Sequence, residues 1–163
     1  MKIYITNLEK YNNGELVGKW VTLPLSNFDT EFEDILKEIG NPEEYFISDY
    51  ECDYYDINEY ENIKDLNALA EYYEGLDEHD QIKLKYVIDD QRLTIKDALD
   101  FELGDIMFYQ NMNLEEVAEC RVDESLFGEI PESIKNYIDY KAIAIDLDCE
   151  GYVETDQGVF YCY

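Results

Sequence analysis

Carboxylates crowd the stretch EEYFISDYECDYYDINEYE, residues 43–61, which holds eight acidic residues, five tyrosines and no Lys or Arg. Groups of this kind can bind calcium, act as general acids and bases, or present fixed negative charge to a basic partner. In a chain with 40 Asp and Glu residues, some pair of carboxylates always lies at acid–base distance, so a glycosidase-like pair has almost no specificity as a signal. The spacing of particular residues must therefore decide between these chemistries.

Calcium binding is the chemistry with the most specific spacing. Asp146, Asp148 and Glu150, followed by Gly151, match the first half of a calcium loop. Position 12 of that loop is Gln157, which cannot supply a bidentate carboxylate, and a strand is expected to follow instead of a helix. A second match places tyrosines where Gly and Glu are needed; its acids are Asp49, Glu51, Asp53 and Asp56. We expect no metal or other cofactor, and an acidic calcium-binding module remains the alternative function.

The other chemical motifs are weak, so we expect no enzyme. His79 is the only histidine, and no Ser or Cys can be tied to it as a nucleophile. Gly14 and Gly18 lie one residue too close for a phosphate loop, and Trp20 replaces the Ser or Thr that would bind magnesium. The cysteines lie far apart and are expected to be reduced thiols: Cys52, Cys120, Cys149 and Cys162.

The net charge restricts the partners. The 40 acidic and 12 basic residues give −28, so neither nucleic acid nor an anionic membrane is an expected partner. The apolar fraction of 46% and the aromatic fraction of 15% are too high for a disordered acidic chain, and the protein is expected to fold. No signal peptide or membrane span is visible, which favours a cytoplasmic location.

The elements that must position the acids begin, in residues 1–61, with a three-stranded sheet and a helix. Thr30 and Glu33 form a capping-box pattern, so a helix is expected to begin near Thr30 and to end before the Gly-Asn-Pro of residues 40–42. The acidic stretch after the third strand is expected to be loop. The three strands are predicted at 3–8, 16–23 and 45–50, the first two joined by a turn around residues 12–14.

Two further units are expected after residue 61. Residues 62–103 have helical periodicity and form a small all-α unit, whose helices end at Gly75 and cover 77–90 and 94–102. Residues 104–163 read as a mixed α/β unit. Its predicted elements are a strand at 105–109, a helix capped by Asn113, a helix from Pro131 that contains Ile134 and Ile138, and a hairpin of 151–155 and 158–163.

The scale of the charge points to electrostatic imitation of DNA. Duplex DNA carries one charge per ~1.7 Å, so the 28 net charges match about 48 Å of duplex, or about 14 base pairs. A rigid surface of carboxylates would enter a basic DNA-binding cleft and use the field that steers DNA there. Tyrosines would add stiff contact area among the acids.

Three blocks of the sequence resemble the ArdA antirestriction proteins of conjugative plasmids and transposons. They are IYITNLEKYNNGELVGKWVTLP, EEYFISDYE and FGEIPESIKNYIDYKAIAIDLD, in the same order as in that family. The resemblance implies a DNA mimic without enzymatic activity that occupies the DNA groove of the specificity and modification subunits of type I restriction-modification enzymes. It also implies a homodimer paired through the C-terminal unit, and a role in horizontal gene transfer. One departure is Ala144-Ile145-Asp146, where the family often has Gly-Arg before the Asp.

The expected fold is therefore α+β: an elongated chain of three small units (α/β, all-α, α/β) with short antiparallel sheets and a strongly acidic surface. The predicted DNA-mimic surface consists of Glu43, Glu44, Asp49, Glu51, Asp53, Asp56, Glu59, Glu61, Glu71, Glu74, Asp89, Asp90, Glu115, Glu116 and Glu119. The predicted dimer contacts are Leu114, Val117, Tyr137, Ile138, Tyr140 and Ile143.

Overall fold

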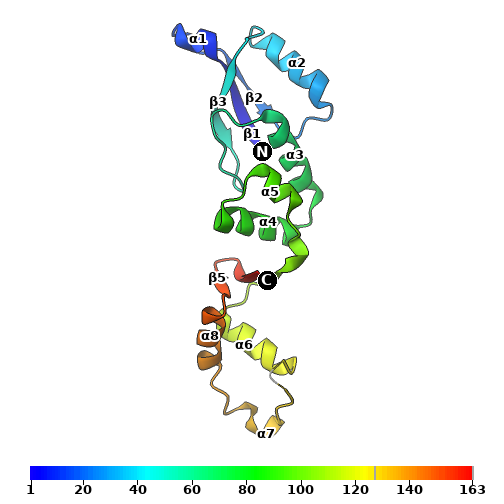
Figure 1. The fold of residues 1–163 in the computed structure, drawn as a ribbon, viewed down its shortest axis with the longest axis vertical. Helices are drawn as coiled ribbons and strands as arrows, with labels where there is room; N and C mark the ends of the chain where they lie inside the picture. The colour runs from blue at the N-terminus through cyan, green and yellow to red at the C-terminus, as the bar shows by residue number, and fades with distance from the viewer. Residues whose placement is uncertain (127, 163) are drawn as a thin grey trace. The chain divides into compact units, whose positions relative to one another are not determined.

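The computed structural model describes residues 1–126 and 128–162, and the chain divides into two units, Met1–Phe101 and Glu102–Tyr163 (Figure 1). Each unit contains one three-stranded antiparallel sheet together with helices. The α+β class and the short antiparallel sheets are therefore confirmed. The division into three units stays a prediction.

The first unit is built on a sheet of order β2-β1-β3. Its central strand carries Ile3 and Ile5 on one face, and both are completely buried, as expected from the alternation of side chains along a strand. α2 packs across the sheet, because Lys19 of β2 pairs with Glu38 and the ring of Tyr45 on β3 meets Phe32. The elements are β1 (Lys2–Asn7), α1 (Leu8–Asn12), β2 (Gly18–Thr22), α2 (Phe28–Glu38), β3 (Tyr45–Glu51), α3 (Ile63–Gly75), α4 (Glu78–Gln91) and α5 (Ile95–Asp100).

Three short helices complete this unit, and polar side chains define where they start. Asn62, Asp77 and Thr94 each accept a backbone N–H in the first turn of α3, α4 and α5. The helices are held together by completely buried side chains: Leu66, Leu69, Ala70, Leu84, Val87 and Ala98. Asn67 of α3 accepts a hydrogen bond of 2.7 Å from the backbone N–H of Leu25. This bond ties α3 to the segment that follows β2.

The second unit has a sheet of order β4-β6-β5 and a separate core. The elements are the 3-10 helix η1 (Leu103–Asp105), β4 (Ile106–Gln110), α6 (Leu114–Asp123), α7 (Glu132–Lys135), α8 (Tyr140–Cys149), β5 (Val153–Thr155) and β6 (Gly158–Cys162). α6 and α8 pack against the sheet through the buried residues Val117, Ala118, Leu147, Tyr152 and Val159. Gly158 is required at its position, because its φ is +137° and a Cβ would lie 2.2 Å from the carbonyl oxygen of Tyr109.

Most of the predicted strands and helices are present with small differences at their ends, but α2 begins earlier than expected. Its N-cap is Asn27, whose side chain accepts from the N–H of Thr30, while Glu31 accepts from the N–H of Asn27. Asn is at least as good a cap as Thr. The helix therefore begins at Phe28, and the extra turn allows Phe28 to stack on Phe32. The predicted turn around residues 12–14 is likewise preceded by a short helix, α1, which the periodicity did not indicate.

The segment after Pro131 also differs from its prediction. The helix that begins there is only α7, Glu132–Lys135, and Ile138 lies outside it. A separate helix, α8, starts after Asp139, whose side chain accepts from the N–H of Ala142. Asp146 and Asp148 therefore lie inside a helix, where their carboxylates cannot converge as they do in a calcium loop. The calcium-loop interpretation of this segment is wrong.

Candidate functional site

The acid-rich stretch 43–61 consists of β3 followed by a loop that is fixed at two points. Tyr54 is only 4% exposed, and its ring stacks on Tyr73 of α3 with the ring centroids 3.7 Å apart and the planes 5° from parallel. The backbone N–H of Ile47 donates to the carbonyl oxygen of Glu59 at 2.8 Å, so the end of the loop returns along β3. The acidic side chains of this stretch are therefore mounted on a rigid backbone.

The aromatic support under this loop stays uncharged up to high pH. Burial raises the pKa of Tyr54 well above its ordinary value, and the neighbouring Cys52 and Tyr73 raise it further. Burial is also the main cause that raises the pKa of Tyr73 and of the Cys52 thiol. An uncharged stack avoids adding negative charge beneath a surface that already repels itself.

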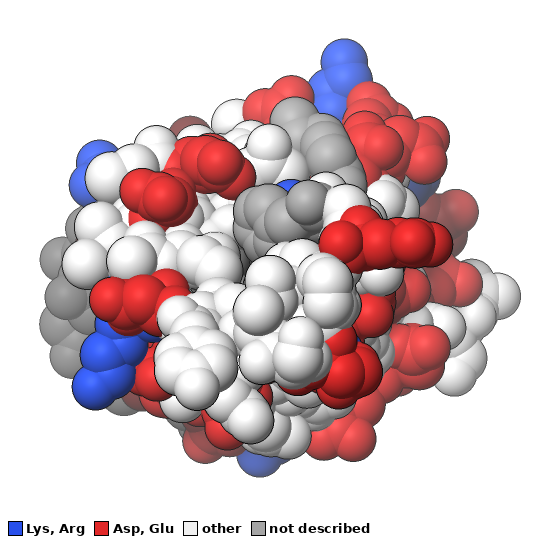
Figure 2. All heavy atoms as spheres, turned by 90° about the horizontal axis from the view of Figure 1, so that it is seen from below, with Lys and Arg blue, Asp and Glu red and all other residues white. Residues whose placement is uncertain are grey.

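Thirteen of the fifteen predicted surface acids are exposed, and the other two, Glu61 and Glu115, are partly buried. Among the described residues, Glu51 is the only one of the fifteen that forms an ion pair, with Lys2 at 2.8 Å. The remaining negative charge is not neutralised by neighbouring cations. Figure 2, which views the molecule from below, shows many acidic and few basic side chains on that face.

Several of these acids lie where they destabilise the fold. Glu74 is in the last turn of α3, and Asp89 and Asp90 are in the last turn of α4. The negative end of the helix dipole disfavours carboxylates there, by roughly 0.3–1 kcal/mol each at an exposed site. Neither last turn contains a basic residue, although Arg92 follows as the C-cap of α4. Stability of the helices therefore does not explain these acids.

On α6 the acids have two roles. Glu116 and Asn113 form a reciprocal capping box. The carboxylate of Glu116 accepts from the backbone N–H of Asn113, and the side-chain oxygen of Asn113 accepts from the backbone N–H of Glu116, both at 2.9 Å. Glu116 therefore stabilises its own helix, whereas no such contact is seen for Glu119 in the described chain. Of the three predicted acids on α6, Glu119 is therefore the one that is both exposed and not used in capping the helix.

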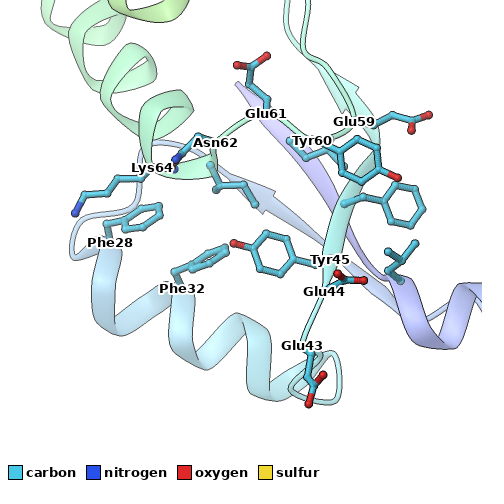
Figure 3. A pocket seen from close by; sticks show the side chains of 14 residues that line it. Phe28, Phe32, Glu43, Glu44, Tyr45, Glu59, Tyr60, Glu61, Asn62 and Lys64 are labelled. Atoms are coloured by element: carbon cyan, nitrogen blue, oxygen red, sulfur yellow. Dashed lines mark hydrogen bonds between the residues drawn. The ribbon is translucent and has the colours of Figure 1, made fainter.

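Residues far apart in the sequence meet in a groove of about 530 Å³ in the first unit (Figure 3). Phe28 and Phe32 of α2 form one wall, and the other is made by β3 and the start of the segment 59–64. The groove also takes in four of the predicted acids: Glu43, Glu44, Glu59 and Glu61. The sequence prediction missed both phenylalanines. Their spacing of four residues near the start of a helix was the available signal, since it places two rings on one helical face.

The predicted dimer contacts divide into core and surface residues. Val117 is completely buried in the core of the second unit, and Leu114, Tyr140 and Ile143 pack against that core. Tyr137 is 86% exposed and Ile138 is partly buried. Two further apolar side chains of this unit, outside the set of six predicted contacts, are also exposed: Ile134 at 50% and Ile145 at 65%. The assignment of the interface stays a prediction.

One group of potential metal ligands comes together at the start of α4. The ligand atoms of Asp77, His79 and Asp80 lie within 4.8 Å of one another. Lys83 pairs with Asp80 at 3.3 Å, so its ammonium group already neutralises part of the negative charge that would attract a metal ion. All three residues are at least partly exposed, which is common for acidic groups that bind no metal.

Comparison with known proteins identifies the family. No similar protein was found among the curated proteins, and no helix in the described part of the chain is long and apolar enough to cross a membrane. The family model "Antirestriction protein (ArdA)" matches residues 3–161, which is almost the whole chain. Membership of this family indicates an antirestriction function and an interaction with restriction enzymes. The chain belongs to the ArdA antirestriction protein family.

Proposed function

We propose that this protein is a DNA mimic that occupies the DNA-binding groove of type I restriction-modification enzymes. It acts on the specificity and modification subunits, in the cytoplasm, and prevents cleavage of DNA that arrives on a mobile element. It performs no catalysis. The observation that carries the proposal is the set of exposed acids with no cationic partner among the residues that the structure describes; Glu74, Asp89 and Asp90 of this set also work against their own helices.

The physical basis is competition for a positive cleft. A protein groove that binds duplex DNA is lined with Lys and Arg, and its field attracts any rigid array of negative charge. The stack of Tyr54 on Tyr73 and the bond from Ile47 to Glu59 hold the loop acids in place before binding. Preorganisation of this kind reduces the entropy lost on association.

A homodimer would double the array of charge, giving a total of about −56 from two chains of −28. The repulsion between two such chains must be overcome by apolar contact. The exposed side chains of Tyr137 and Ile145 in the second unit are suited to that role, since neither is charged and neither is covered in the single chain.

A competition assay tests the proposal. A purified type I methyltransferase core holds a labelled duplex with its recognition site, and the protein is titrated in at low and at moderate salt. We expect near-stoichiometric displacement that weakens as salt rises. A polyglutamate of equal total charge is the control, because it carries the charge without the fixed spacing. Equal displacement by polyglutamate, or none by the protein across several type I families, would contradict the proposal.

A further inference from the structure

The groove of the first unit combines aromatic rings with carboxylates in one concave site. Phe28 stacks on Phe32 with centroids 5.2 Å apart and planes 12° from parallel, and Phe32 meets the edge of Tyr45 at 5.6 Å. On the other side of the groove, Tyr60 lies 6.4 Å from Phe46. Figure 3 shows Tyr60 on the β3 side, away from the α2 wall. Tyr60 is 72% exposed, so a large ring is held at the surface instead of in the core.

The charge of this groove is strongly negative. Four glutamates and one lysine contribute to its lining, and none of the five forms an ion pair in the described chain. Figure 3 places Lys64 beside Phe28 at one end, while Glu44 and Glu59 lie on the side of Tyr45 and Tyr60. The half of the groove around Tyr60 therefore offers ring faces and carboxylates to a cation.

We propose that this groove receives an arginine side chain of the protein whose DNA-binding cleft the acidic surface occupies. This inference rests on the proposed function and specifies the chemistry of the partner at one site. A guanidinium is planar, stacks on aromatic faces and binds a carboxylate with two parallel hydrogen bonds. The rings of Tyr60 and Tyr45 provide the faces, and Glu44 and Glu59 provide the carboxylates.

The same features exclude the other simple ligands. The four glutamates repel phosphate and other anions. A lysine ammonium is a compact, strongly hydrated charge that gains less from ring faces and from paired carboxylates than a guanidinium does. An apolar peptide would have to bury the carboxylates without a partner, which is unfavourable. In a DNA-binding cleft the arginines contact phosphates and base edges, so such a side chain is available when DNA is displaced.

Binding of short peptides tests the groove independently of any restriction enzyme. Blocked Gly-Arg-Gly, Gly-Lys-Gly and Gly-citrulline-Gly are titrated into the ¹⁵N-labelled protein, and amide shifts are followed by NMR. We expect shifts concentrated at residues 43–47 and 59–64, with the arginine peptide binding at least about threefold more tightly than the lysine peptide. Citrulline should cause no such shifts because it lacks the charge. Shifts spread evenly over all acidic segments, or equal binding of all three peptides, would overturn the inference.

Substitutions test the groove in the complex. In the displacement assay, Tyr60→Ala should weaken the protein about fivefold, as expected for loss of a cation–π contact, while Tyr60→Phe, which keeps the ring, should restore it. Glu44→Gln with Glu59→Gln should weaken it about tenfold. The matched pair Asp89→Asn with Asp90→Asn also removes two charges and should weaken it about twofold. Equal effects of the two pairs would overturn the inference, whereas a wild-type protein that displaces no DNA would refute the proposed function itself.

Discussion

The two units expose different kinds of large apolar side chain. In the first unit four of the five are aromatic: Tyr11, Trp20, Tyr50 and Tyr60, with Leu16 as the exception. Among the described residues of the second unit, four of the five are aliphatic: Leu126, Ile134, Ile145 and Val153, with Tyr137 as the exception. Both units are acidic, with net charges of −16 for residues 1–101 and −12 for residues 102–163. Charge alone therefore does not distinguish them.

This difference indicates that the two units are suited to different kinds of contact. An aromatic ring among carboxylates can contact a cation through its face and keeps a polar tip in water. An exposed isoleucine or valine can do neither and is stabilised only by being covered. We infer that the first unit is the better suited to basic side chains of another protein, and the second to contact with a second copy of the chain.

The largest expected effect comes from removing many acids of the first unit together. One variant changes six acids to their amides: Glu43, Glu44, Asp49, Asp53, Asp56 and Glu59. It should displace DNA roughly a hundredfold more weakly than the wild type, because exposed charge contacts contribute about 0.5 kcal/mol each. The matched control neutralises six exposed acids of the second unit: Glu124, Glu129, Asp146, Asp148, Glu150 and Asp156. This control should lose at most about tenfold. Equal losses in the displacement assay would show that the two units do not differ in this respect.

The second prediction concerns self-association. Tyr137→Ser with Ile145→Ser should weaken dimerisation at least about tenfold, since two exposed apolar side chains would lose their cover. Sedimentation equilibrium measures the change. Leu16→Ser is the control, because Leu16 is 69% exposed but lies in the first unit. If Leu16→Ser weakened the dimer and Tyr137→Ser with Ile145→Ser did not, the dimer interface would lie in the first unit instead of the second.

The third prediction uses the pKa shift of Tyr54. Burial raises this pKa in the folded state. The stability that neutral Tyr54 contributes is therefore fully present below its pKa in the unfolded chain, about 10, and is lost as pH rises above that value. The free energy of unfolding should therefore fall by up to about 1.4 kcal/mol per pH unit from this group. In Tyr54→Phe the fall should be less steep. Urea unfolding between pH 8 and pH 11 measures this dependence of the free energy of unfolding on pH, with Tyr137→Phe as the control. The same dependence in the wild type and in Tyr54→Phe would contradict the prediction.

The smallest effect is expected for single charges. Asp89→Asn should change displacement of DNA by no more than about twofold, because binding is distributed over many acids. The same change should stabilise the first unit slightly, by a few tenths of a kcal/mol, since it removes a carboxylate from the C-terminal turn of α4. Thermal unfolding gives the second value. A loss of tenfold or more in displacement would show that this one carboxylate is a specific contact.

The sequence predicted the elements whose pattern is local. The strand at 45–50, the helix that ends at Gly75 and the helix capped by Asn113 all follow from periodicity or from a single capping residue, and all are present. At the start of α2 the capping-box pattern at Thr30 was misleading, because the N-cap is Asn27, three residues earlier. The short helices α1 and α7 lie below the length at which periodicity is informative.

The groove could not be predicted because it depends on contacts between distant segments. Glu59 and Tyr60 reach the groove only because the loop after β3 turns back along that strand, and Phe28 and Phe32 arrive from α2. Composition identified the acids and rings as important without showing which of them lie together. The placement of Val117 inside a core likewise depends on how α6 meets α8, which a helical pattern does not specify.

The hydrogen bond from Ile47 to Glu59 has a consequence for solubility. β3 is an edge strand of its sheet, and an open strand edge is a template on which other chains aggregate. The returning loop occupies part of that edge, and the carboxylates of Asp49 and Glu51 further along it repel any approaching acidic chain. We therefore expect the arrangement that fixes the acidic loop also to oppose pairing between the sheets of neighbouring molecules, and so to favour solubility over fibril formation.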